Sequence, residues 1–289
     1  MGGPIPNWIN TPRNYCLTPG ANLSQRLLVR MAYDAMNTIG TSNAKFLTPP
    51  VNDPLDQMGP NGWEYLYLSY GGWRYANVLS AHAYLQGKTV QDVCCDANNS
   101  VVGLTVNTRK AFFPIPYPPI FFTEGGYGSN PHIPSDDAAW IGAYYTLILS
   151  SGTAANVANL DWYAYDIKAN LWEGPPNNVL TEAGTALGVM QQDWGYDGAT
   201  FDAAGCAEIT CGNGNRWTCN LTEGGGSGTQ AQVAWYDGAV NDDSCSYSPG
   251  GNPPWVDYRD LSGDPPTGYN GQLVPLTNRP ILFEHGPGH

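Results

Sequence analysis

Apolar segments of two different periods alternate along the first two thirds of the chain, and this pattern constrains the fold more than any single motif. Apolar residues at three- and four-residue spacing predict helices, and short continuous apolar runs predict buried strands. The resulting order, helix, strand, helix, strand, strand, helix, strand, helix, indicates parallel βα units. The predicted helices cover 24–40, 62–73, 136–152 and 180–194, and the predicted strands cover 44–51, 75–85, 120–128 and 157–166.

The helix predicted over 24–40 has the clearest limits. Ser24 is placed to cap its N-terminus, and Gly40 is placed to end it. Residues 86–119 show no regular period and end in a proline-rich arm, so an irregular segment is expected there. The residues predicted to form the apolar face of the helix are Leu27, Leu28, Met31, Ala35 and Met36.

The pattern changes after about residue 195. From there, short alternating runs are separated by Gly, Pro and Asp turns, which is typical of antiparallel strands. We therefore expect an α/β domain over 1–195 and an all-β sandwich module over 196–289.

Composition argues against two classes of partner. The 289 residues carry a net charge of −13 with only 12 Lys and Arg, so nucleic acid is not expected, because phosphate binding needs basic patches. No segment approaches the roughly 18 consecutive apolar residues of a membrane span. Polarity comes from Asn, Ser, Thr and Gly, with 18 Tyr and 10 Trp. This mix suits an extracellular protein that binds carbohydrate, although a loop-rich secreted β fold would also explain it.

Seven cysteines indicate an oxidising compartment. Four of them lie near the C-terminus without a His at metal-ligand spacing, so disulfides are expected rather than zinc: Cys206, Cys211, Cys219 and Cys245. Three sequons are candidate glycosylation sites, at Asn22, Asn98 and Asn220. We expect a secreted protein, although the N-terminal "MGGPIPNWIN" lacks the basic start and apolar run of a signal peptide.

Polar side chains stand at the ends of the predicted strands, where parallel βα units bring side chains together. The apolar run "IFF" leads through Thr123 into Glu124 and two glycines, and His82 lies near the end of the strand over 75–85. A carboxylate nucleophile with flanking aromatic residues and a His is typical of a retaining glycosidase. Glu124 is therefore the candidate catalytic residue, and the candidate substrate-binding residues are His82, Tyr127, Trp162, Tyr163, Tyr165 and Asp166.

Each of these residues has a structural alternative. A Glu after an apolar strand commonly caps a turn, a single His commonly makes a structural hydrogen bond, and the aromatic residues of 162–165 are commonly core. Retaining chemistry also needs a second carboxyl group. Asp161 is taken to open a strand, at the wrong end for the site, which leaves Asp166 at the close of that strand as the candidate.

Other common chemistries lack their motifs. The chain has no Gly-rich phosphate loop, no HExxH and no GxSxG, which argues against nucleotide binding, zinc proteolysis and serine hydrolysis. We expect no cofactor and no metal.

Six segments occur in a recognisable order: "LLVRMAYDAMNTIG", "KFLTPPV", "ANVLSAHAYL", "IFFTEGGYG", "AAWIGAYYTLILSSG" and "LDWYAYD". Their order and spacing resemble those of clan A glycoside hydrolases, in particular members of the family-39 type. The helix over 180–194 resembles the one that closes such barrels, and 217–284 resembles the β-sandwich that follows them. The likeness runs from about residue 24 to residue 284.

The resemblance implies a partial (β/α)8 barrel, about strands four or five to eight, followed by a β-sandwich. It implies that Glu124 is the nucleophile at the end of strand seven, with His82 on strand six and 162–165 on strand eight. The acid/base of the family is the Glu of an Asn-Glu-Pro motif after strand four. The nearest match here is "WINTPRN", with Thr11 where the Glu would stand, and strands one to three have no counterpart.

A half barrel exposes strand edges and a bare core face. We therefore expect self-association, another half that is a separate chain or a removed segment, or a truncated reading frame. Two functions follow. One is a glycosidase for β-linked sugars that needs the missing half, and the other is a non-catalytic extracellular carbohydrate-binding or structural protein derived from such an enzyme.

In this arrangement Cys219–Cys245 is expected across the sandwich and Cys206–Cys211 within a local loop. Cys16 is expected to pair with Cys94 or Cys95.

Overall fold

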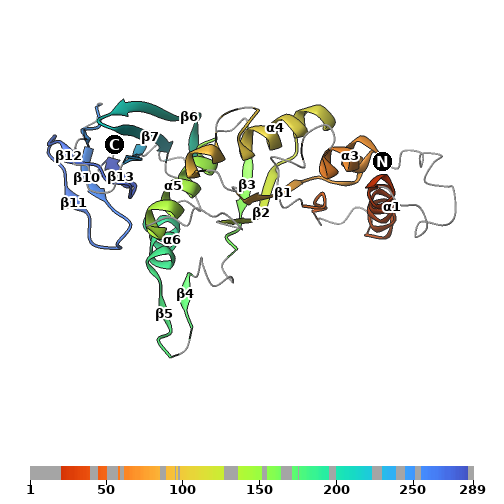
Figure 1. The fold of residues 1–289 in the computed structure, drawn as a ribbon, viewed down its shortest axis with the longest axis horizontal. Coiled ribbons are helices and arrows are strands. Elements are labelled where there is room, and N and C mark those ends of the chain that lie inside the picture. Colours follow the sequence, from red (N-terminus) through yellow and green to blue (C-terminus); the bar gives the residue numbers. More distant parts are fainter. Residues whose placement is uncertain are drawn as a thin grey trace. The chain divides into compact units, whose positions relative to one another are not determined.

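Figure 1 shows the helices and strands of the computed structural model. The chain divides into two compact units. Unit 1 combines 1–86, 96–125 and 155–162, and unit 2 combines 87–95, 126–154 and 163–289. The domain boundary expected near residue 195 stays a prediction. The residues that the structure describes are 21–39, 45–50, 58, 62–84, 89–94, 96, 98–126, 136–151, 155–163, 171–174, 176–194, 200–222, 230–238, 245–250 and 255–285.

A sheet forms the centre of unit 1. Its strands are hydrogen-bonded in the order of the chain, and all residues of the first are buried, as expected of a strand covered on both faces. A parallel bridge between Leu47 and Val78 represents the strand predicted over 44–51. The strands are β1 (Leu79–Tyr84), β2 (Ile120–Gly126) and β3 (Val157–Leu160).

The three strands run in one direction. In β2 and β3, which are parallel, Phe122 lies opposite Leu160. The N–H of Leu79 bonds to the carbonyl that precedes β2, whereas Tyr84 meets Glu124 near the end of β2. The ends of β1 therefore match the corresponding ends of β2, and the predicted parallel arrangement is present in this unit.

The helix α1 (Ala21–Ile39) differs from its prediction in two ways. It begins before Ser24, which therefore lies inside the helix and does not cap it. Val29 is fully buried, whereas Leu27 and Met31 of the predicted apolar face are 41% and 56% exposed. The reason is the position of its neighbours, α3 (Trp63–Ser69) and the 3₁₀ helix η1 (Gly72–Tyr75). The face toward them carries Arg26 over the ring of Tyr70 and Tyr33 against Tyr75.

The segment 86–119 was predicted to be irregular, and this was wrong. It contains α4 (Val101–Phe112) in unit 1 and the 3₁₀ helix η2 (Val90–Val93) in unit 2. The side chain of Ser100 caps α4 by accepting a hydrogen bond from Gly103 N at 3.0 Å. The residues Val101, Val102 and Thr105 are buried. β-Branched residues and glycine have low helix propensity, so capping and burial decide the structure here.

Arg109 ties α4 to the start of the sheet. It is almost fully buried, and its Nη1 donates to the carbonyl of Pro118 at 3.1 Å and to that of Ala155 at 2.5 Å. These carbonyls lie shortly before β2 and β3. Burial lowers the pKa of Arg109, and the guanidinium also lies 5.4 Å from the centre of the Tyr117 ring. One buried cation thus holds the starts of two strands.

Glu64 is a buried acid within α3. It has no exposed surface, and neither carboxyl oxygen makes a hydrogen bond of normal geometry to a described residue. The neighbouring hydroxyl of Thr48 accepts from Ser80 N and donates to Ser80 O, so it is already engaged. Burial raises the pKa of Glu64 well above its ordinary value, and the Thr48 hydroxyl opposes this only in part.

A raised pKa in the fold means that the folded state holds the Glu64 proton more tightly than the unfolded state. The stability that protonated Glu64 contributes to the folded state is complete below the ordinary carboxyl pKa of about 4.3. It is lost as pH rises through the pKa of Glu64 in the folded state. We expect Glu64→Gln to raise the thermal midpoint of unit 1 at about pH 8 and to change it little near pH 4. Thermal scans across pH measure this, with exposed Glu208→Gln as the control. Equal gains at both pH values would contradict the prediction.

Unit 2 contains two helices in contact and an antiparallel sheet. α5 (Asp137–Leu149) is capped by Asp136, which accepts from Ala139 N at 2.9 Å. α6 (Glu182–Gln192) is capped by Thr181. In the described part of the chain, no helix combines the length and apolar character needed to cross a membrane.

The sheet of unit 2 has the strand order β11-β10-β13-β8-β7-β6, and its neighbours pair antiparallel. Antiparallel strands after residue 195 are therefore confirmed, while the sandwich and the partial barrel remain predictions. Its strands are β6 (Thr200–Cys211), β7 (Gly214–Thr222), β8 (Gln230–Tyr236), β10 (Trp255–Arg259), β11 (Thr267–Gly268) and β13 (Ile281–His285). Two short ribbons pair β4 (Trp172–Glu173) with β5 (Val179–Leu180) and β9 (Ser246–Tyr247) with β12 (Val274–Pro275).

The disulfide pairing differs from the prediction. Cys206 is bonded to Cys219, its neighbour across β6 and β7, and Cys211 is bonded to Cys245. Cys206 and Cys211 lie on one strand, where extended residues advance about 3.3 Å each, so the two cannot approach to the roughly 5.5–6 Å of a disulfide. Cys94 is also disulfide-bonded. The predicted partners Cys16 and Cys95 lie outside the described residues.

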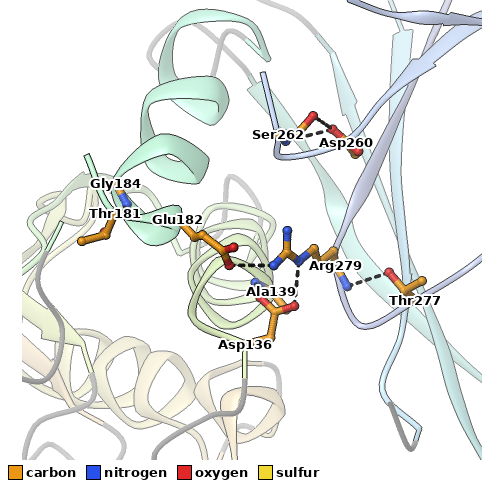
Figure 2. A network of polar contacts seen from close by, with 9 residues as sticks. All are labelled: Asp136, Ala139, Thr181, Glu182, Gly184, Asp260, Ser262, Thr277 and Arg279. Atoms are coloured by element: carbon orange, nitrogen blue, oxygen red, sulfur yellow. Dashed lines mark hydrogen bonds and ion pairs between the residues drawn. The ribbon is translucent and has the colours of Figure 1, made fainter. Parts of the chain in front are cut away.

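Arg279 joins the starts of the two helices of unit 2 (Figure 2). Its Nε donates to Asp136 at 2.7 Å, and its Nη2 donates to Glu182 at 2.8 Å. Each carboxylate is favourable at a helix N-terminus, but the two repel each other, and the guanidinium offsets this repulsion. The hydrogen bond to Asp136 is the main reason why the pKa of Arg279 is raised.

We expect Arg279→Ala to lower the free energy of unfolding of unit 2 by about 1 kcal/mol, because it breaks two ion pairs that share one cation. Arg30→Ala is the control, since it breaks the exposed Arg30–Asp34 pair, which should contribute roughly 0.3–0.5 kcal/mol. Urea unfolding followed by tryptophan fluorescence measures both losses. A loss for Arg279→Ala no larger than that of the control would contradict the shared-cation interpretation.

Candidate active site

The candidate site lies at the carboxyl ends of the strands of unit 1. β1 carries His82 and Tyr84, two residues apart and therefore on the same face, and β2 carries Glu124. Parallel pairing brings these ends to one edge of the sheet. The predicted pair His82 and Glu124 thus comes together from strands that are far apart in the sequence.

Both neighbours of Glu124 contact the same carboxylate oxygen. The hydroxyl of Tyr84 donates to Oε2 at 2.9 Å, and Nδ1 of His82 lies 3.3 Å from it. His82 is buried, whereas the Glu124 side chain is 38% exposed, so the carboxylate is held by buried groups but remains open to solvent. Sequence reasoning missed Tyr84, although its two-residue spacing from His82 was a usable signal.

A layer of hydroxyl groups lies below this site. Oγ of Ser80 lies 3.2 Å from Oγ1 of Thr123, and Thr48 accepts from Ser80 N at 2.9 Å. These bonds link the strand segment at Leu47 to β1, and β1 to β2. They fix the spacing of the strands immediately before Glu124.

Two opposing effects act on the pKa of His82. Burial lowers it, and the Glu124 carboxylate raises it by a smaller amount, so the net direction is below the ordinary value. His82 is therefore neutral at pH 7, and its Nδ1–H tautomer can donate to Glu124. Because the folded-state pKa is lowered, the stability that neutral His82 contributes is present above about pH 6.5 and is lost as pH falls.

We expect His82 to titrate below pH 6.5, and we expect Glu124→Gln to lower its pKa further, because the variant removes the attracting charge. Histidine NMR across pH, with His82→Gln to assign the signal, measures this. Glu208→Gln is the control, since that exposed carboxylate lies on β6 in unit 2. A rise in the His82 pKa in Glu124→Gln would contradict the prediction.

The end of β3 corrects one interpretation. The strand stops at Leu160, so Asp161 lies directly after its carboxyl end and not at its start. Its N–H bonds to Phe122 O at 2.8 Å, and its Oδ2 accepts from Asn159. Trp162 follows and is partly buried. The aromatic residues after Leu160 had extended the predicted strand beyond its end.

The remaining predicted residues are placed as follows. Tyr163 is 44% exposed and belongs to unit 2. Tyr127, Tyr165 and Asp166 lie outside the described residues. The described residues contain no group of three or more His, Cys, Asp or Glu side chains that could hold a metal ion.

Of the sequons, Asn22 lies in α1, and Asn98 is exposed in the turn before α4. Asn220 is exposed on β7, where it accepts a hydrogen bond from Gln232. Glycosylation of these residues stays a prediction.

Comparison with known proteins supports a glycoside hydrolase fold. No protein-family model and no curated protein matches the chain. A solved xyloglucanase of glycoside hydrolase family 44 from Paenibacillus polymyxa, with xyloglucan, is similar at a TM-score of 0.56 and 12% identity over 93% of this chain. Another structure of a Paenibacillus polymyxa family 44 xyloglucanase is similar at a TM-score of 0.54 and 12% identity over 92% of this chain.

The chain spans 62% and 61% of the length of these two structures. At this identity the likeness concerns the fold. The resemblance to the family-39 type is not confirmed.

Proposed function

We propose that this chain descends from a retaining glycosidase for β-linked sugars and that Glu124 stands at the nucleophile position. The observation that carries the proposal is that the two carboxylate oxygens of Glu124 have different contacts. Both contacts of Glu124 fall on Oε2, from Tyr84 and His82, and Oε1 makes no hydrogen bond to a described residue. Oε1 is then the oxygen that attacks the anomeric carbon, while the donors on Oε2 orient the carboxylate.

Charge supports the same assignment. The partners of Glu124 are a phenol and a neutral imidazole, so no cation neutralises it among the described residues. A nucleophilic carboxylate must keep its negative charge until it bonds to the sugar. Exposure of the side chain leaves room for a substrate.

The acid/base is the part that this chain lacks in the proposal. Retaining chemistry needs a second carboxyl group about 5–5.5 Å from the nucleophile. Thr11 stands where the resemblance calls for a Glu, and the candidates from the strand ends are Asp161, which directly follows β3, and Asp166. We infer that the chain alone hydrolyses ordinary glycosides slowly or not at all.

The wider organisation is part of the proposal. Residues 1–195 form the glycosidase-like partial barrel, and 196–289 form the β-sandwich module. A second copy or another chain covers the open edge of the barrel, and the protein acts outside the cell. The disulfides of unit 2 are consistent with secretion.

Activated substrates separate the nucleophile from the missing acid. A dinitrophenolate leaves without protonation, so 2,4-dinitrophenyl 2-fluoro-β-glycosides should trap a covalent glycosyl ester on Glu124 even without an acid/base. We expect intact-protein mass spectrometry to show this label on the wild-type chain and on Glu208→Gln, and none on Glu124→Gln. Tyr84→Phe should label about 10- to 100-fold more slowly, because it loses a hydrogen bond to a charged group.

The second candidate is a non-catalytic carbohydrate-binding or structural protein, favoured by the absence of a Glu at Thr11. If this second function is correct, the activated glycosides form no covalent ester on the chain, yet sugars still bind. Xyloglucan oligosaccharides are added as probes because the two similar structures are xyloglucanases. Label that persists in Glu124→Gln would refute the nucleophile assignment.

A further inference from the structure

We propose that unit 2 carries a separate ligand site, a cavity beside the start of α5 that takes one ring of a neutral sugar. The proposal does not rest on Glu124 or on glycosidase chemistry. The cavity has a volume of about 220 Å³ and is lined from η2, α5, the end of β8 and the turn before β13. The lining residues on which the proposal depends are Gln91, Trp140, Trp235, Tyr236, Asp237 and Asn278.

Aromatic rings provide the apolar part of the wall. Trp140 stacks on Tyr144 with a centroid distance of 4.8 Å, and Trp235 stacks on Trp217 at 5.8 Å. Trp235 and Tyr236 are 1% exposed and support the wall from behind, whereas Trp140 is 7% exposed and offers the larger aromatic surface, and packing fixes all three before a ligand arrives. Preformed aromatic surface with a few polar groups is typical of small-molecule sites, and it suits the C–H face of a sugar ring.

Hydrogen-bond acceptors provide the polar part. Oδ1 of Asp237 accepts from Asn215 N at 2.6 Å, and Oδ2 accepts from Trp217 Nε1 at 2.9 Å. Each carboxylate oxygen has two acceptor positions, so these bonds leave one on each oxygen. The partly exposed amides of Gln91 and Asn278 add donors and acceptors. Sugar hydroxyl groups match such a set, since each can donate and accept.

The charge of the lining residues narrows the class of ligand. No Lys or Arg is among the described residues that line the cavity, so an anionic ligand finds no counter-charge there. A neutral ring with several oxygens meets all of these conditions.

The test is a titration of the whole chain with glucose, xylose and cellobiose, in which saturation-transfer NMR measures the binding of each sugar. Gln91→Ala and Asn278→Ala each remove one amide from the cavity, and Gln192→Ala removes an exposed amide at the end of α6 as the control. We expect saturable binding that each cavity variant weakens about ten-fold, the loss of roughly one hydrogen bond. Gln192→Ala should leave the binding unchanged.

Other outcomes overturn the proposal. Sugar binding that is lost in Glu124→Gln and kept in both cavity variants would assign the ligand to the strand ends of unit 1. No saturable binding to the wild-type chain, or binding of ethylammonium in place of the sugars, would refute the sugar assignment. Circular dichroism checks the fold of each variant, and testing the two amides separately means that misfolding of one variant leaves the other informative.

Discussion

Parallel hydrogen bonding between the strands of unit 1 is the constraint on which the candidate site depends. Tyr84 and Glu124 are 40 residues apart in the sequence, and they meet because β1 and β2 end at the same edge of the sheet. Arg109 holds the opposite edge, where β2 and β3 begin. Because the starts and the direction of these strands are fixed, their carboxyl ends have little freedom to move. A carboxylate that reacts must be held in one orientation at such an end.

Two buried ionisable groups make unit 1 sensitive to pH from both sides. Glu64 is more stable buried as a neutral acid, so its contribution falls as pH rises. His82 is more stable buried as a neutral base, so its contribution falls as pH drops. The two groups lie on different elements, α3 and β1, and the shared cause is removal of a charged form from water. Glu64 contributes fully only below about pH 4.3 and His82 only above about pH 6.5, so no single pH gives unit 1 both contributions in full.

The sequence predicts elements well where period and caps agree, as in α5, α6, β1 and β2. It fails where tertiary burial overrides propensity, as in α4, whose β-branched start reads as irregular. It also fails where pairing across a sheet decides the outcome. Cys206 bonds to Cys219 because β6 and β7 place them opposite each other, and single-sequence patterns do not contain that register. The same limit hid Tyr84, whose role depends on which strand lies next to β1.

The hydrogen bonds of each carboxylate separate structural from chemical roles. Asp136 accepts from Ala139 N on one oxygen and from Arg279 on the other, so both of its oxygens are engaged and its charge is neutralised. Glu284 is likewise paired with an arginine, Arg259. Glu124 is arranged differently, because its donors are neutral and converge on a single oxygen. A carboxylate that only holds the fold together gains from full pairing, whereas one that attacks carbon must keep a charge and an uncommitted oxygen. This difference is the physical basis for the proposal that Glu124 is the nucleophile.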